Sequence, residues 1–350
     1  MSNTISQPTA QPRPVSAGSP LLEVKNLRVQ FRTRAGVVTP LDGVNFSINR
    51  GETVAILGES GSGKSVTAQA IMGLLPSPAG KITGGQIIYD GKDLAAMRIS
   101  EVRKLCGTEI AMIFQDPLSS LNPVFRVGAQ IAEPFRRRRG MSRAESRAQA
   151  IELMERVGIP EAKRRVDDYP HQFSGGMRQR VMIAMALALE PTLLIADEPT
   201  TALDVTVQAQ IMDLLASLQR ERGMAMMLIT HDLGVVADVA KRTAIMYAGR
   251  IVETGVIRDV YDTPAHPYTE GLLASIPSAA GIGERLTPIV GSPPNLLAVP
   301  VGCPFNPRCP YAVDRCREER PELRHPGGWP EGQLAACHRT EEVLSHDVHA

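Results

Sequence analysis

The stretch that decides the fold is Gly58-Glu59-Ser60-Gly61-Ser62-Gly63-Lys64-Ser65. It matches the phosphate-loop pattern GxxxxGK(S/T) at every fixed position. In such a loop the glycines allow backbone N–H groups to surround a chain of phosphates. The lysine reaches the outer phosphates, and the serine hydroxyl binds Mg²⁺. The sequence therefore predicts a binding site for a nucleoside triphosphate with Mg²⁺.

The segments on either side of this loop predict a strand and a helix. Residues 53–57 (TVAIL) form an apolar run typical of a buried strand, and residues 66–75 have helical spacing. The N-terminus of that helix would face the phosphates, where the helix dipole favours an anion. A glycine-rich turn without a ligand is the alternative, and the strand-loop-helix context argues against it.

Composition and charge limit the class of protein. The chain has 350 residues, of which 43% are hydrophobic and 21% charged, which is typical of a globular protein with room for two domains. A net charge of +1 gives no general attraction to nucleic acid. The longest apolar run, residues 181–189, is far shorter than the roughly 18 residues of a membrane span. Any membrane contact is therefore expected through partner proteins.

The first twenty residues are rich in Ser, Pro, Gln and Thr, and they contain no apolar stretch of the kind found in secretion signals. We therefore expect residues 1–20 to form a disordered tail. With no such signal and five cysteines in the whole chain, the expected compartment is the reducing cytoplasm.

Further patterns lie on both sides of the loop. Upstream, residues 21–31 and 41–48 predict an antiparallel pair of strands joined by a turn-rich interval. Downstream, residues 127–157 have a helical pattern that includes four consecutive arginines at 136–139. Such a run is typical of a solvated helix face, and contact with a partner or with lipid head groups is the alternative.

Three predicted strands downstream of the loop end in polar residues. These residues are Gln115, the pair Asp197 and Glu198, and His231. Because ligands of α/β sheets bind at the carboxyl ends of the strands, these side chains are expected near the phosphate loop. Asp197 would assist Mg²⁺, and Glu198 would activate water as a base. Taken singly, each residue has a plain alternative as a loop or structural residue.

Two other positions suit a nucleotide. Residues 173–177 (FSGGM) place Ser-Gly-Gly at a helix start, where free N–H groups and the helix dipole favour an anion. Phe31 ends the first predicted strand, where its ring could stack on an adenine, and a plain core position is the alternative. Each of these signals is weak alone.

Together, the motifs closely resemble the ATP-binding subunit of ABC transporters. The resemblance covers roughly residues 21–260 and rests on the order Phe31, GESGSGKS, Gln115, FSGGM, LLIADE, ALD and His231. It implies an α/β fold with a P-loop NTPase (RecA-like) core, an antiparallel β subdomain and an α-helical subdomain at about residues 116–178.

The resemblance also implies roles for the site residues. Glu198 would polarise the attacking water, and His231 would hold the γ-phosphate and that water in place. The ligand would be ATP with Mg²⁺. The implied ATP-binding residues are Phe31, which stacks on the adenine, Gly58 to Ser65 and Gln115, and the implied Mg²⁺ residues are Ser65, Gln115 and Asp197.

The signature motif departs from the family pattern LSGGQ, because Phe173 and Met177 replace its first and last residues. The resemblance implies a sandwich dimer closed by two nucleotides, in which the signature of one subunit completes the ATP site of the other. A second ABC ATPase subunit is therefore an expected partner, with a heterodimer preferred to a homodimer. The implied signature residues are Ser174, Gly175, Gly176, Met177 and Gln179, and Asp204 lies in the expected dimer-interface loop.

Residues 261–350 resemble the C-terminal extension of dipeptide and oligopeptide importer ATPases, through HPYT at 266–269, GSPP at 291–294 and the segments 302–309 and 336–338. The resemblance implies ATP-driven peptide uptake. An importer of nickel or another small solute is the alternative, and a soluble ABC ATPase without a transport role is a third possibility. The expected partners are two transmembrane permease subunits and an external solute-binding protein, without nucleic acid, at the cytoplasmic face of the inner membrane.

Four cysteines, Cys303, Cys309, Cys316 and Cys337, gather in this extension with the spacing C-x5-C-x6-C-x20-C. Four thiolates could hold Zn²⁺ or a [4Fe–4S] cluster, and the spacing fits neither paired zinc knuckles nor a ferredoxin run. The resemblance favours the iron–sulfur cluster, with Zn²⁺ or no metal as alternatives. Cys106 lies far away in sequence and is expected to be a buried small residue.

Overall fold

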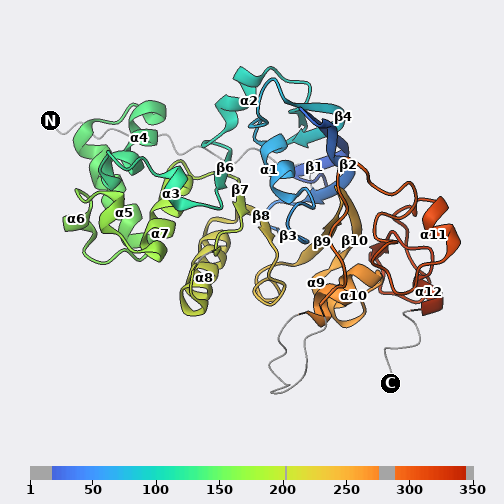
Figure 1. Cartoon of the computed structure of the whole chain (residues 1–350). Coiled ribbons are helices and arrows are strands. Elements are labelled where there is room, and N and C mark those ends of the chain that lie inside the picture. Colours follow the sequence, from blue (N-terminus) through green and yellow to red (C-terminus); the bar gives the residue numbers. More distant parts are fainter. Residues whose placement is uncertain (1–17, 202, 276–287, 344–350) are drawn as a thin grey trace.

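The strand that leads into the phosphate loop lies inside the larger of two sheets (Figure 1). This strand, β3 (Thr53–Leu57), is buried along its whole length and pairs in parallel with β8 (Ala225–Thr230) and β9 (Arg242–Tyr247). The structure is a computed structural model that describes residues 18–201, 203–275 and 288–343. Nearly all of the predicted N-terminal tail lies outside these ranges.

The larger sheet contains seven strands in the order β11-β10-β9-β3-β8-β7-β6. β7 (Leu193–Asp197) and β6 (Ile110–Ile113) continue the parallel arrangement, and β10 (Arg250–Val256) and β11 (Leu334–Ala335) are antiparallel. The parallel strands have apolar side chains on both faces because both faces of such a sheet are covered. Their carboxyl ends therefore meet at one edge, where the phosphate loop lies.

The smaller sheet is antiparallel and has the strand order β2-β1-β4-β5. The interval expected to be turn-rich is mostly strand, because Thr33 pairs with Gly36 and only Arg34 and Ala35 form the turn between them. The β-formers Val37, Val38 and Thr39 extend the second strand beyond its predicted start. The strands are β1 (Leu22–Thr33), β2 (Gly36–Ile48), β4 (Gly80–Tyr89) and β5 (Lys92–Asp93).

Five helices form a separate lobe beside β6 and β7 (Figure 1). The helical pattern predicted at 127–157 corresponds to two helices, because Gly140 takes a left-handed conformation (φ 67°) and Ser142 caps the second helix. The arginine run lies at the exposed C-terminal end of the first helix, where Arg137 pairs with Glu133. The helices are α3 (Pro117–Ser120), α4 (Val127–Arg139), α5 (Arg143–Arg156), α6 (Ala162–Arg165) and α7 (Gly175–Leu187).

The remaining helices of the described ranges lie beside the two sheets or in the C-terminal extension, apart from one short 3₁₀ helix in the helical lobe. Within these ranges, no helix combines the length and the hydrophobicity that a membrane crossing requires. Beside the sheets lie α1 (Lys64–Ile71), α2 (Ile99–Leu105), α8 (Val205–Arg222), α9 (Ile257–Asp262) and α10 (Pro267–Ala274), and the extension adds α11 (Asp314–Glu318) and α12 (Thr340–Val343). The 3₁₀ helix η1 (Pro170–Gln172) lies in the helical lobe directly before α7, where its Pro170 carbonyl oxygen accepts from Arg178 Nε.

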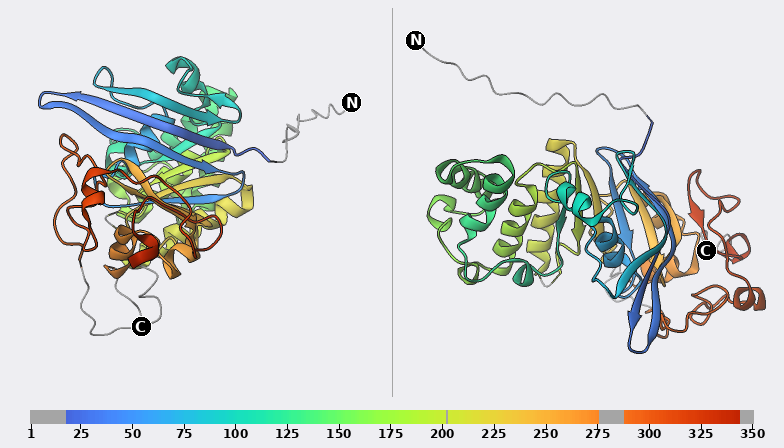
Figure 2. Two further views of the ribbon diagram at one scale, coloured as in Figure 1. Left: turned by 90° about the vertical axis from the view of Figure 1, so that its right-hand side faces the viewer. Right: turned by 90° about the horizontal axis from the view of Figure 1, so that it is seen from above.

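The C-terminal extension packs along the side of the core that β9 and β10 form (Figure 2). Its strand β11 pairs with β10, with Ala335 opposite Glu253 and Leu334 opposite Thr254. A second attachment joins the extension to β2, where Arg320 Nη1 donates to Asp42 Oδ2 at 2.7 Å. The extension is therefore bound to both sheets of the core.

Glu253 is a fully buried carboxylate at this junction. Its oxygens accept hydrogen bonds from the backbone N–H groups of Ala265 (2.7 Å) and His266 (3.0 Å) and from Gln333 Nε2 (2.7 Å). Burial is the largest influence and raises the pKa of Glu253 to about 7, although these hydrogen bonds oppose the rise. The folded protein therefore binds a proton here at a pH where the unfolded chain, with a pKa of about 4.3, has released it.

This carboxylate is expected to make folding stability depend on pH. Because the folded-state pKa is raised, the free energy of unfolding should decrease by about 2–4 kcal/mol as pH rises from about 4.5 to 7. His266 gives the opposite slope, since burial lowers its pKa to about 3. Denaturant unfolding of the wild type and of Glu253→Gln across this range isolates the Glu253 contribution, because His266 is common to both. Parallel pH curves for the two proteins would contradict the prediction.

Candidate nucleotide site

The phosphate loop has a backbone shape that requires glycine at two positions. Gly58 has φ 149°, and a Cβ there would lie 2.2 Å from the carbonyl oxygen of Met246. Gly63 has φ 107°, and a Cβ there would lie 2.6 Å from the carbonyl oxygen of Pro40. A side chain at either position would push the loop away from its support. The fixed glycines of the motif therefore hold the loop against β9 and β2.

Lys64 is the first residue of α1, and its side chain turns back toward the start of the phosphate loop. Its Nζ donates to the carbonyl oxygens of Gly58 (2.8 Å) and Glu59 (3.0 Å), and the residue is 5% exposed. Burial lowers the pKa of Lys64, while the negative charges of Glu198, Asp197 and Glu59 act in the opposite direction. A buried ammonium group at the start of a helix is well placed to receive phosphate oxygens.

Two polar groups beside the lysine fit a nucleotide with Mg²⁺. The Ser62 hydroxyl is buried and has no hydrogen-bond partner among the described residues, so a phosphate oxygen would satisfy it. Ser65 Oγ donates to Asp197 Oδ1 at 3.0 Å. Burial raises the pKa of Asp197, and the negative charge of Glu198 adds to the rise. This pair of oxygen-bearing groups has the chemistry that Mg²⁺ prefers.

Glu198 lies at the centre of the expected catalytic group. Its Oε2 accepts hydrogen bonds from Gln115 Nε2 (2.9 Å) and Thr201 Oγ1 (2.8 Å), and its Oε1 lies 3.3 Å from His231 Nδ1. Burial alone would raise the pKa of Glu198, but the hydrogen bond from Thr201 and the interactions with His231 and Lys64 hold it below its usual value. The carboxylate is therefore ionised at neutral pH and able to accept a proton.

The structure brings together the polar residues that follow the three predicted strands. Gln115 and His231 are both exposed, and both reach Glu198 from neighbouring strands of the sheet. Thr201 was not predicted, although its position three residues after Glu198 suits a local hydrogen bond. Glu198 itself has a positive φ of 46°, which is uncommon for a residue other than glycine.

The signature residues lie elsewhere in the chain. Ser174 caps α7, and its Oγ accepts a hydrogen bond from the backbone N–H of Met177 at 3.4 Å. The helix begins at Gly175, and Gly176 faces Val207, whose Cγ1 would be 2.7 Å from an added Cβ. Figures 1 and 2 place α7 in the helical lobe and α1 beside the smaller sheet. This chain therefore does not bring its own signature to its own phosphate loop.

Three other predicted positions lie outside this cluster, and two of them have local structural roles. Asp204 caps α8 by accepting a hydrogen bond from the backbone N–H of Val207 at 3.0 Å. Phe31 is half-buried on β1 and packs on Gly80, where a Cβ would lie 2.4 Å from the ring. Gln179 is buried on α7, and its Nε2 has no partner among the described residues.

The four cysteines of the extension line one small cavity together with His266 and His338. Burial raises the pKa of Cys303 to about 12 and that of Cys309 to about 11, and the neighbouring thiols add to both rises. Within the described ranges, no three His, Cys, Asp or Glu side chains are arranged to hold a metal ion. The predicted cluster therefore has its donor atoms gathered but no arranged site to support it.

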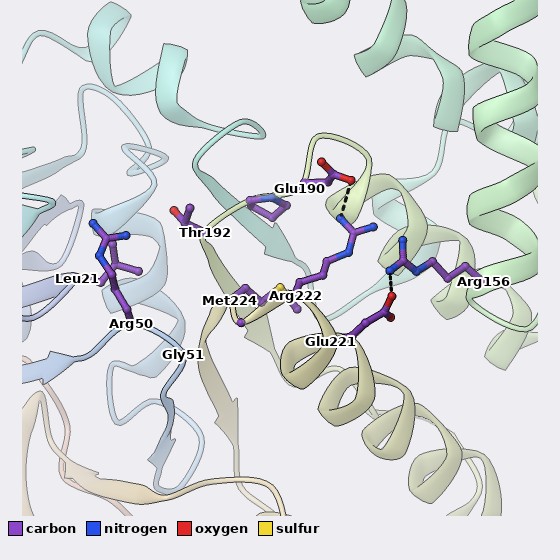
Figure 3. Close-up of a pocket in the computed structure, with 11 residues that line it drawn as sticks. Leu21, Arg50, Gly51, Arg156, Glu190, Thr192, Glu221, Arg222 and Met224 are labelled. Atoms are coloured by element: carbon purple, nitrogen blue, oxygen red, sulfur yellow. Dashed lines mark hydrogen bonds and ion pairs between the residues drawn. The ribbon is translucent and has the colours of Figure 1, made fainter. Parts of the chain in front are cut away.

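A larger pocket of about 350 Å³ lies at the opposite edge of the sheet (Figure 3). It is lined by residues that precede β3, β7 and β8, including Arg50, Thr192 and Met224. Ion pairs of Glu190 with Arg222 and of Glu221 with Arg156 line the side of the pocket opposite Arg50. Because ligands of parallel sheets bind at the carboxyl ends of the strands, we assign the nucleotide to the phosphate-loop edge and not to this pocket.

Two family models match the chain. The model described as ABC transporter matches residues 41–201, and the model described as oligopeptide/dipeptide transporter, C-terminal region, matches residues 252–316. The two matches cover the phosphate loop with the helical lobe, and most of the described extension.

Curated relatives and solved structures extend these matches. A putative peptide import ATP-binding protein of Brucella melitensis is 53% identical over 341 residues, covering 93% of this chain and 99% of the relative. The oligopeptide transport ATP-binding protein OppD of Bacillus subtilis is 53% identical, covering 87% of this chain and 85% of its own length. An ATP-binding cassette solved as a dimer, in a post-hydrolysis state bound to ADP and Pi, is 32% identical with a TM-score of 0.61, over 68% of this chain and 99% of that chain.

Proposed function

The chain belongs to the ABC transporter family and carries the C-terminal region of its oligopeptide/dipeptide branch, and we propose that it is the ATP-hydrolysing subunit of a dipeptide or oligopeptide importer. One observation carries this proposal. The similarity to peptide import proteins extends over nearly the whole chain, including both the ATPase core and the extension. An ATPase core alone would be compatible with many substrates.

The site geometry supports hydrolysis by in-line attack of water on the γ-phosphate. The ionised Glu198 carboxylate would accept the proton of the water, and His231 beside it would hold the water in place. Lys64 would neutralise charge on the outer phosphates. Ser65 and Asp197 would hold Mg²⁺ together with Gln115, whose Nε2 donates to Glu198 in this structure, and the bound ion would stabilise charge on the phosphate oxygens.

The separation of the signature from the phosphate loop supports a sandwich dimer. Because Ser174 and Gly175 lie in the helical lobe, the free N–H groups there would serve the ATP site of a second ABC ATPase subunit. We assign Phe31 to the adenine and Asp204 to the dimer interface on the same family logic. A heterodimer remains our preferred arrangement.

We place the subunit at the cytoplasmic face of the cell membrane, bound to two permease subunits and supplied by an external solute-binding protein. The proposed domains are an ATPase at 21–260, with its helical part at about 116–178, and the extension at 261–350. An importer of nickel or another small solute is the second candidate, and a soluble ABC ATPase without transport is the third.

Purification of the tagged full-length chain from detergent-solubilised membranes tests the proposal. We expect two hydrophobic permeases and a second ATPase subunit to co-purify. In proteoliposomes with ATP inside and the binding protein outside, peptides should stimulate hydrolysis and labelled peptide should accumulate. Stimulation by Ni²⁺ but not by peptides would favour the second candidate, and recovery with ribosomes or RNA but no permease would overturn transport.

We also propose that the four cysteines hold a metal group, with [4Fe–4S] favoured and Zn²⁺ as the alternative. The proposal is supported by the one cavity that all four cysteines line, and by the backbone N–H of Arg339, which donates to Cys337 Sγ at 3.4 Å. A bound metal would require thiolates, so it would have to lower the thiol pKa values that burial raises. The expected role of the metal group is to cross-link the C-terminal extension, which has little regular secondary structure, and so to stabilise its fold.

Metal analysis of the complex purified without oxygen tests this assignment. We expect about four iron and four sulfide per chain, with loss of both in Cys316→Ser, because Cys316 is the buried cysteine of the four. Cys106→Ser is the matched control, since Cys106 lies beside α2 and should leave the metal content unchanged. One zinc per chain would support the alternative, and no metal in either protein would reject both.

A further inference from the structure

Arg308, in the C-terminal extension, contacts the phosphate loop directly. Its Nη1 donates to Glu59 Oε2 at 2.6 Å and its Nη2 donates to Glu59 Oε1 at 3.0 Å, so the ion pair is bidentate. The arginine side chain is 5% exposed and the glutamate side chain 27% exposed. Planar bidentate pairs of this kind fix geometry as well as charge.

The guanidinium group of Arg308 is itself held on several sides. Its Nε donates to the carbonyl oxygen of Val290 (3.1 Å), and its two Nη atoms also approach the carbonyl oxygen of Ile289 and the hydroxyl of Tyr247, both at 3.4 Å. The group lies over the rings of Tyr247 and Phe305, at 5.9 and 6.0 Å from their centroids. These contacts therefore hold the two Nη atoms of Arg308 in a fixed orientation toward Glu59, unlike those of a flexible surface arginine.

A second residue outside the loop holds the backbone of Glu59. The Tyr268 hydroxyl accepts a hydrogen bond from the Glu59 N–H at 2.9 Å, and Tyr268 is fully buried on α10. Its ring packs against Tyr247, with the centroids 4.6 Å apart. The Glu59 carbonyl is bound in turn by Lys64. If phosphates draw Lys64 Nζ away, Glu59 keeps its attachments to Tyr268 and Arg308, beside the local hydrogen bond that its carbonyl oxygen accepts from the Ser62 N–H at 3.2 Å.

Residues 293–296 of the C-terminal extension also lie beside the phosphate loop. Pro293, Pro294 and Leu296 line a small cavity together with residues 59–62 of the phosphate loop. The segment that contains Arg308 thus supports one side of the loop by packing as well as by charge.

We propose that Arg308 and Tyr268 are positioning residues that hold Glu59 so that the phosphate loop of the same chain stays in its ATP-binding shape. This inference rests on the proposed ATP site. Without the two attachments, the loop would occupy other conformations, and only the competent fraction would bind nucleotide. The apparent affinity for ATP falls in proportion to that fraction, while the bound complex reacts as before.

Steady-state ATP hydrolysis by the assembled transporter tests the proposal with four variants. Arg308→Ala should raise KM for ATP about 5- to 20-fold and change kcat by less than about 2-fold, since the loss concerns loop preorganisation. Tyr268→Phe, which keeps the ring and its packing, should raise KM by about 3- to 10-fold. Glu59→Ala should raise KM by about as much as Arg308→Ala does. The double variant Glu59→Ala/Arg308→Ala should have a KM no higher than that of either single variant, because both remove the same ion pair.

Arg320→Ala is the matched control, because Arg320 also joins the extension to the core, but through Asp42 of β2 and not through a residue of the phosphate loop. Its KM should equal that of the wild type. An equal rise in Arg320→Ala would show that general docking of the extension matters, and the positioning role would be wrong. Unchanged KM in both Arg308→Ala and Tyr268→Phe would overturn the inference alone, whereas a wild type that fails to bind ATP would overturn the proposed function as well.

Discussion

Glu198→Gln is expected to lower kcat for ATP hydrolysis by about 10²–10⁴-fold, while ATP still binds. Gln keeps the shape of the side chain and can still contact Gln115, Thr201 and His231, but it cannot accept a proton from water. The ionised state of Glu198 in the wild type makes this loss large, because its pKa lies below the usual value. Phosphate release and equilibrium ATP binding by the assembled transporter measure the two effects separately.

Glu190→Gln is the control for this substitution. Glu190 is an exposed acid that lies at the opposite edge of the sheet and pairs with Arg222, so its removal should leave turnover unchanged. Hydrolysis by Glu198→Gln at a near-normal rate would refute the assignment of Glu198 as the base.

Lys64→Ala is expected to weaken ATP binding by about 10²-fold or more and to abolish measurable hydrolysis. The lysine places a buried positive charge at the mouth of the loop, and charge-assisted hydrogen bonds are among the strongest in proteins. Arginine should not replace it, because Nζ sits in a narrow space between the Gly58 and Glu59 carbonyl groups.

Binding of a fluorescent ATP analogue measures this loss directly. Lys163→Ala is the control, since Lys163 is exposed on α6 in the helical lobe and should bind the analogue as the wild type does. Wild-type affinity in Lys64→Ala would mean that the nucleotide does not bind in this loop.

The sequence predicted the elements whose patterns are strongly periodic. The comparisons confirm the P-loop α/β class and the family, and the structure has β3 at its predicted residues 53–57. The signature helix α7 begins at Gly175, within the Ser-Gly-Gly segment that the sequence places at a helix start, because the Ser174 cap outweighs the low helix propensity of the two glycines. Local capping is a weaker sequence signal than an apolar run.

The part of the site that follows from strand order could also be predicted. Gln115, Glu198 and His231 follow neighbouring strands, so a parallel sheet must bring them to one edge. The contact of Arg308 with Glu59 joins residues 249 positions apart and follows from no local pattern. It depends on how the extension packs against β9, which the spacing of apolar residues does not specify.

The pairing of β11 with β10 also covers part of the edge that β10 would otherwise form in the larger sheet. An exposed edge strand presents a row of unpaired N–H and C=O groups on which another chain can add a strand. Here Leu334 and Ala335 cover Thr254 and Glu253, and the residues that follow continue over the same strand, since the Ala336 N–H donates to the Val252 carbonyl oxygen. The extension thus covers the backbone groups of β10 at residues 252–254 that would otherwise be open to a strand of another chain.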